Sequence, residues 1–99
     1  MKQTGAEEAV AQTREKAEAE GRQFIEECRR LKEGGKLAAC RKLTLAKYEE
    51  VIGPVPEKAD WRRLHLEVAY TLFVRGYERE GALHLLPEKM RERYEAIPV

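Results

Sequence analysis

The large apolar side chains of this chain are concentrated after Phe24. Thirty of the 99 residues are Val, Ile, Leu, Met, Phe, Trp, Tyr or Cys, and only Met1 and Val10 precede Phe24. Burial of such side chains is the main driving force for folding. We therefore predict one domain with a core over residues 24–99 and a core-poor helical arm over residues 1–23.

Residues 6–33 contain no proline and are dominated by Ala, Glu, Arg, Lys and Gln, which favour helix. Small or apolar residues recur there at spacings of three and four, at Ala17, Gly21, Phe24, Cys28 and Leu31, and Val10 extends the pattern backwards. This is a heptad-like seam. Its first half is too poor in side chains to drive burial alone, so we infer that it packs on a neighbouring element or chain.

Three further helices are predicted after a break at Gly34-Gly35. The second runs from Lys36 to Ile52 and is antiparallel to the first, because the loop is short. The third begins near Pro56 or Asp60, continues to Arg75 or beyond, and is apolar around most of its circumference, which is typical of a central helix. Gly76 and Gly81 are expected to loosen the chain.

Pro87 is expected to begin a last helix that ends near Ile97. No period-2 run of β-branched residues and no Asn-Gly or Asp-Gly turn favours a strand. The sequence therefore predicts an all-α, four-helix, bundle-like domain: a long N-terminal helix, an antiparallel hairpin, a central apolar helix and a short C-terminal helix.

Several chemistries are excluded by missing residue types. The chain has no serine and no asparagine, and Asp60 is its only aspartate. It therefore lacks the residues for a serine nucleophile triad, an Asx-rich calcium loop or an N-glycosylation sequon. No phosphate-binding glycine loop and no complete catalytic set is present, so we expect a non-enzymatic protein without cofactor or metal.

The same composition bears on compartment and source. No apolar stretch reaches 18 residues, and the first residues include no apolar signal segment, so we expect a cytoplasmic protein. Abundant Glu, Lys and Arg with no Asn or Ser is typical of heat-adapted proteins.

The two cysteines are the first candidates for chemistry. Cys28 and Cys40 flank Gly34-Gly35 at similar distances, so an antiparallel hairpin places them at similar heights. Inert core thiols and a thiol-based redox pair are both compatible with this spacing. A zinc site that also used His65 and His84 would match only in the number of ligands, because none of the four stands in a paired spacing.

The charges nearly cancel over the chain, 19 basic against 18 acidic, but not locally. Residues 29–47 include seven basic residues and one acidic residue, Glu33, so the net charge of this stretch is seven minus one, or +6. This basic hairpin suits contact with an RNA or DNA backbone, which is sequence-independent. The candidate nucleic-acid-binding residues are Arg29, Arg30, Lys36, Arg41, Lys42 and Lys47.

The leading interpretation is an interaction or assembly protein that binds another protein or its own copy. It rests on the core-poor arm and on the third helix, whose apolar residues exceed what one neighbour covers. The candidate partner-binding residues are Val10, Ala17, Phe24, Trp61, Tyr70, Val74 and Tyr77. Nucleic-acid binding through the basic hairpin and thiol chemistry at Cys28 and Cys40 remain the two alternatives.

Overall fold

The computed structural model describes residues 2–90, and their side chains from residue 5 onwards. Over this range the chain forms three α-helices and one 3₁₀ turn, with no strand: α1 (Lys2–Glu33), α2 (Leu37–Val51), α3 (Trp61–Arg79) and η1 (Leu83–Leu85). The all-α prediction is confirmed, but a four-helix bundle is not. The predicted last helix lies largely in residues 91–99, outside the described residues.

The ends of the helices follow the punctuation of the sequence. After α1, Gly35 adopts φ +74°, and the N–H groups of Gly35 and Lys36 bond to the carbonyls of Lys32 and Leu31 at 3.1 and 2.8 Å. This is the Schellman arrangement, in which a left-handed glycine satisfies the last carbonyls of a helix. At the start of α3, the Asp60 carboxylate accepts the Arg62 N–H at 3.1 Å, as expected of an N-cap.

Gly76 does not loosen the chain. α3 continues through it to Arg79, and Gly81 ends the helix with φ +65° in a second Schellman arrangement. The difference arises because the two glycines serve different purposes. Gly81 supplies a backbone conformation that other residues adopt at a cost, whereas Gly76 is buried inside the helix against α1.

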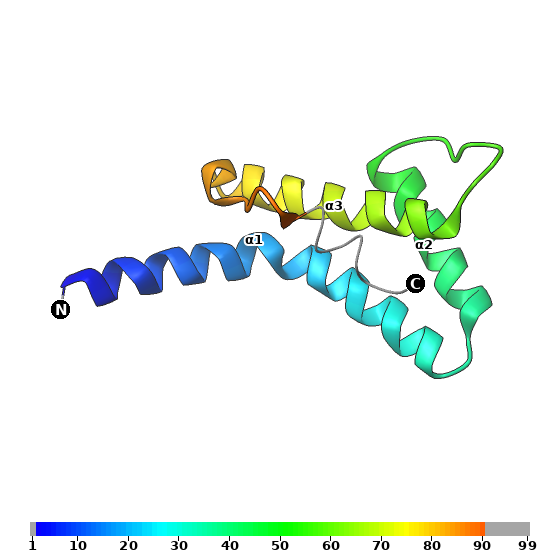
Figure 1. Cartoon of the computed structure of the whole chain (residues 1–99), viewed down its shortest axis with the longest axis horizontal. Helices are drawn as coiled ribbons and strands as arrows, with labels where there is room; N and C mark the ends of the chain where they lie inside the picture. The colour runs from blue at the N-terminus through cyan, green and yellow to red at the C-terminus, as the bar shows by residue number, and fades with distance from the viewer. Residues whose placement is uncertain (1, 91–99) are drawn as a thin grey trace.

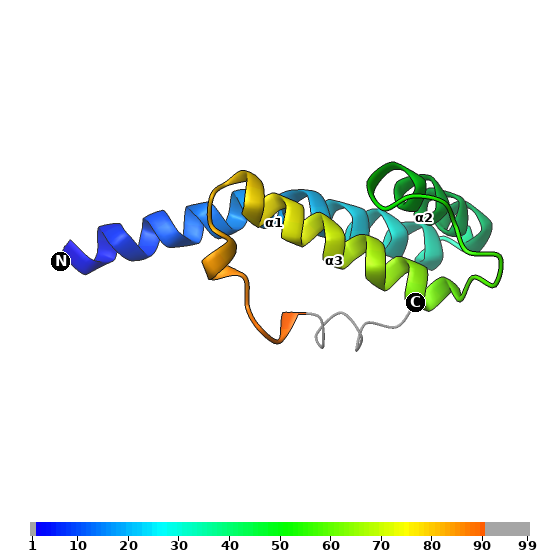
Figure 2. The same cartoon turned by 90° about the horizontal axis from the view of Figure 1, so that it is seen from above.

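α3 is the central helix, as predicted. It runs antiparallel to α1, and α2 packs against both of these helices (Figures 1 and 2). After α3 the chain reverses direction and returns alongside the three helices. One core cluster, centred on Phe24, Val68 and Leu72, lies where all three helices meet. A second, centred on Phe73 and Tyr77, lies between α1 and the segment that reaches Met90.

The N-terminal half of α1 extends beyond the other helices (Figures 1 and 2). Buried residues begin at Ala17 rather than at Phe24, whereas residues 5–16 are exposed except for the half-buried Thr13. We call residues 5–16 the arm. The radius of gyration is 15.1 Å, larger than the ~13 Å expected for a compact chain of this length, as a projecting helix requires.

Candidate functional site

α1 and α3 approach each other closely where Ala17 meets Gly76. A Cβ atom at Gly76 would lie 1.8 Å from the backbone oxygen of Ala17, so only glycine fits there. One turn further along α1, a Cβ atom at Gly21 would lie 2.6 Å from the ring of Phe73. The seam of small residues that the sequence shows in α1 is therefore the surface on which α3 lies.

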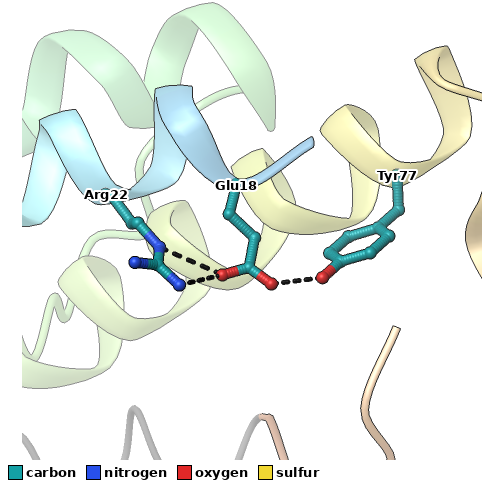
Figure 3. A network of polar contacts seen from close by, with 3 residues as sticks. All are labelled: Glu18, Arg22 and Tyr77. Atoms are coloured by element: carbon teal, nitrogen blue, oxygen red, sulfur yellow. Dashed lines mark hydrogen bonds and ion pairs between the residues drawn. The ribbon is translucent and has the colours of Figure 1, made fainter. Parts of the chain in front are cut away.

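A partly buried polar network crosses this interface beside the close contact (Figure 3). The Tyr77 hydroxyl of α3 donates to the carboxylate of Glu18 on α1, and the Arg22 guanidinium donates to the same carboxylate, with Nε 3.0 Å from Oε1. Burial, followed by the bond and the negative charge of Glu18, raises the pKa of Tyr77 to about 12. The network fixes the register of α3 on α1.

Three of the predicted partner-binding residues lie in the chain's own core. Ala17 and Tyr77 are 0% exposed and Phe24 is 2% exposed. Their placement on a partner surface is therefore corrected: α3 and α2 cover the seam of α1 from Ala17 onwards, and Tyr77 points across it to Glu18. Sequence periodicity predicts that a stripe is buried, but it does not show whether the same chain or a partner buries it.

The remaining predicted partner-binding residues have some exposed surface. Val10 lies on the arm and is 40% exposed, whereas Trp61, Tyr70 and Val74 of α3 are half-buried. The Arg41 guanidinium covers the Trp61 ring at 5.2 Å from its centroid, a cation–π contact between α2 and α3. Of the seven, Val10 is thus the residue least covered by its own chain.

Two basic residues of the basic hairpin form ion pairs with glutamates on their own helices. Arg29 is paired with Glu26 one turn earlier on α1, and Lys47 is 3.5 Å from Glu50 on α2. Arg30, Lys36 and Lys42 are exposed, and Arg41 is exposed apart from its contact with Trp61. The positive charge therefore gathers at the α1–α2 loop and the first turns of α2.

The two thiols are free and buried, and they lie close enough to interact. Cys28 Sγ is 3.8 Å from Thr44 Oγ1, and the Thr44 hydroxyl also donates to the Cys40 carbonyl at 2.9 Å. Burial raises the pKa of the Cys28 thiol to about 12, with the Cys40 thiol acting in the same direction. A raised pKa suppresses the thiolate, so this environment opposes thiol-based catalysis.

We expect Cys28 to be inert in the folded protein. A shift from the ordinary value of 9.0 to about 12 lowers its thiolate fraction near neutral pH about a thousandfold. A chromogenic thiol reagent should therefore label it only as fast as the chain unfolds, with rapid labelling in denaturant as the control. Labelling of the folded protein at the rate of a free cysteine would contradict this.

His65 is a second buried titratable group. It is 7% exposed, its ring lies 5.1 Å from that of Phe24, and its Nδ1 has no hydrogen-bond partner among the described residues. Burial, and to a smaller extent the charge of Lys32, lowers the pKa of His65. The lowered pKa favours the neutral imidazole in the folded state.

This burial predicts acid sensitivity. Because the pKa of His65 is lower in the folded than in the unfolded chain, the unfolded chain takes up the proton first as the pH falls below about 6.5. We expect the free energy of unfolding to fall by up to about 1.4 kcal/mol per pH unit there. His65→Phe should remove this slope in urea unfolding, whereas His84→Gln, at an exposed position, should retain it. An unchanged slope in His65→Phe would refute the assignment.

Comparison with protein-family models, curated proteins and solved structures gives no match to this chain. Among residues 2–90, no helix is both long and apolar enough to cross a membrane. No three His, Cys, Asp or Glu side chains converge as metal ligands in the described part of the chain.

Proposed function

We propose that this protein is a non-enzymatic assembly protein that associates with a second copy of itself through the arm of α1. The observation that carries the proposal is a continuous helical stripe of which only half is covered. Within the part of the chain that the structure describes, α3 and, beside Cys28, α2 cover the stripe from Ala17 towards the C-terminus of α1, and α3 ends at Arg79. Ala6 and Val10 continue the same stripe along the arm and are exposed.

Helix geometry shows that this is one stripe. At 3.6 residues per turn, positions separated by three, four or seven residues share a face. Its members fall within an arc of about 80°; they are Ala6, Val10, Thr13, Ala17, Gly21, Phe24, Cys28 and Leu31. The covered half is core, so the exposed half offers the same kind of surface to a second helix.

The charges beside the stripe favour a second copy as the occupant. Glu7 and Arg14 both flank the stripe on the same side, about 60–80° from its centre, whereas Glu8 points away from it. When two arms pair antiparallel about Val10, Glu7 of each copy meets Arg14 of the other. An arm that presents both signs in this order is self-complementary under a two-fold axis, which is the symmetry of most homodimers.

The association is expected to be weak. The arm of 12 residues, counted from 5 to 16, is about 18 Å long, and its stripe is made of small side chains around Val10. Such an interface lies below the area of about 1,200 Å² that stable complexes bury. We therefore expect a dimer whose population rises with concentration.

Charge exchange tests this pairing. Glu7→Arg alone and Arg14→Glu alone should each weaken dimerisation, because each replaces two attractive contacts by two repulsive ones. The expected loss is about 1–2 kcal/mol, which raises the dissociation constant of the dimer roughly five- to thirtyfold. The combined variant Glu7→Arg/Arg14→Glu should restore it. Glu8→Arg is the matched control, since it makes the same charge change on the opposite face of the arm.

The measurement is the dimerisation constant from sedimentation equilibrium, with urea unfolding of each variant to confirm that the fold is intact. Equal weakening by Glu7→Arg and Glu8→Arg would show that only net charge matters. Failure of the combined variant to recover would likewise contradict the pairing of Glu7 with Arg14.

A further inference from the structure

A small pocket between the three helices gathers positive charge that no sequence motif reveals. It lies where the end of α1, the first turns of α2 and the start of α3 meet, and its volume is about 140 Å³. Lys32 comes from α1, Arg41 from α2 and Arg62 from α3. Three cations from three separate helices thus line one opening, and among residues 2–90 no carboxylate lines it.

Two other pockets of the described chain carry charges of both signs. The pocket at the start of α3 is lined by Lys58 and Arg63 but also by Asp60 and Glu67. The pocket at the α1–α2 loop contains Glu27 beside Arg30 and Lys36. The charges balance in the pocket at the start of α3 and partly cancel in the pocket at the α1–α2 loop. In the pocket between the three helices, which we call the three-helix pocket, all the charges are positive.

The walls of the pocket suit a polar ligand. Thr44 and Cys40, both buried, contribute to its lining, as does Trp61. The Arg41 guanidinium is held over that ring, which fixes the orientation of its remaining N–H groups. A cation positioned in advance loses less side-chain entropy when it binds a ligand.

We propose that this pocket binds a single phosphate group through Lys32, Arg41 and Arg62. Its volume of about 140 Å³ suits one tetrahedral oxyanion, because it falls well short of the roughly 300 Å³ typical of sites for drug-sized molecules. A planar guanidinium group can donate two parallel hydrogen bonds to two oxygens of one phosphate, and the lysine adds a positive charge. The phosphate is either free or part of a nucleic-acid backbone.

Trp61 provides the measurement, because it is the only tryptophan in the chain. Inorganic phosphate should change its fluorescence saturably when the ionic strength is held constant with sodium chloride. A short single-stranded RNA is titrated in parallel, and competition between the two identifies the source. If RNA binds in the pocket, inorganic phosphate displaces it; if the pocket takes only free phosphate, RNA leaves the phosphate titration unchanged. Both results support the site.

Lys32→Gln should weaken phosphate binding roughly tenfold, because it removes one charge-assisted contact to the phosphate. Lys42→Gln is the matched control: it removes an exposed charge next to Arg41 on α2 that does not line the pocket. Urea unfolding of both variants checks the fold.

The absence of a saturable phosphate response in the folded wild-type protein would overturn the proposal. Equal losses in Lys32→Gln and Lys42→Gln would overturn it as well, because they would indicate attraction to net charge alone. The result is independent of dimerisation, since the pocket and the arm lie at opposite ends of α1.

Discussion

Gly76→Ala is expected to destabilise the fold more than the same substitution at any other glycine of this chain. The new Cβ atom would lie 1.8 Å from the backbone oxygen of Ala17, and a backbone atom cannot rotate away as a side chain can. Either α1 and α3 separate or the backbone distorts. Overpacking of a core typically costs about 1–3 kcal/mol. We expect about 3 kcal/mol or more here, despite alanine's higher helix propensity.

Gly5→Ala is the matched control. Gly5 lies in the arm, and a Cβ atom there meets nothing within 4 Å. The substitution should therefore stabilise α1 slightly, by at most about 1 kcal/mol, through helix propensity. Urea unfolding of both variants gives the comparison. A Gly76→Ala variant as stable as the wild-type protein would show that α1 and α3 do not pack at this distance.

Tyr77→Phe and Glu18→Ala are expected to have the next largest effects. Removing the Tyr77 hydroxyl deprives the buried Glu18 carboxylate of a hydrogen-bond donor, and such a loss costs about 1–3 kcal/mol. Arg22→Ala should cost under about 1 kcal/mol, because its side chain is 72% exposed and solvent screens the ion pair.

A double-mutant cycle isolates the contact between Tyr77 and Glu18. The combined variant should lose less stability than the sum of the two single variants, with a coupling energy of about 0.5–3 kcal/mol, because once one partner is gone the other has little left to lose. Strict additivity would mean that the two side chains do not bond in solution.

The same contact predicts a loss of stability in alkali. The pKa of Tyr77 is about 12 in the folded chain, against 10.0 as its ordinary value. The stabilisation is fully present below pH 10 and is lost as the pH rises towards 12, because the unfolded chain releases its proton first. The stability difference between the wild-type protein and Tyr77→Phe should therefore shrink over that range. A constant difference would contradict the raised pKa.

Local signals in the sequence predicted the helices well. Gly34-Gly35, the Asp60 cap and the proline-rich end of α2 act on their immediate neighbours, so their effects follow from short stretches of chain. The seam of small residues in α1 was also visible, because helical periodicity repeats within one element. The sequence did not show that α3 packs on this seam, because α3 is distant from α1 along the chain.

The polar features depended on tertiary contacts, which the sequence does not show. Glu18 is one of seventeen glutamates, and nothing nearby distinguishes it; its burial results from Tyr77, 59 positions later. The three-helix pocket is similar, because Lys32, Arg41 and Arg62 meet only once α2 and α3 have folded onto α1. The sequence placed positive charge in the hairpin but could not show which cations converge.

Sedimentation equilibrium of the unmodified chain over a wide range of concentrations tests the central claim most directly. Self-association through the arm predicts an average mass that rises with concentration from the monomer value of 11.4 kDa towards twice that value. A mass that stays at 11.4 kDa at every concentration, up to the limit of solubility, would contradict the proposal that the arm pairs with a second copy.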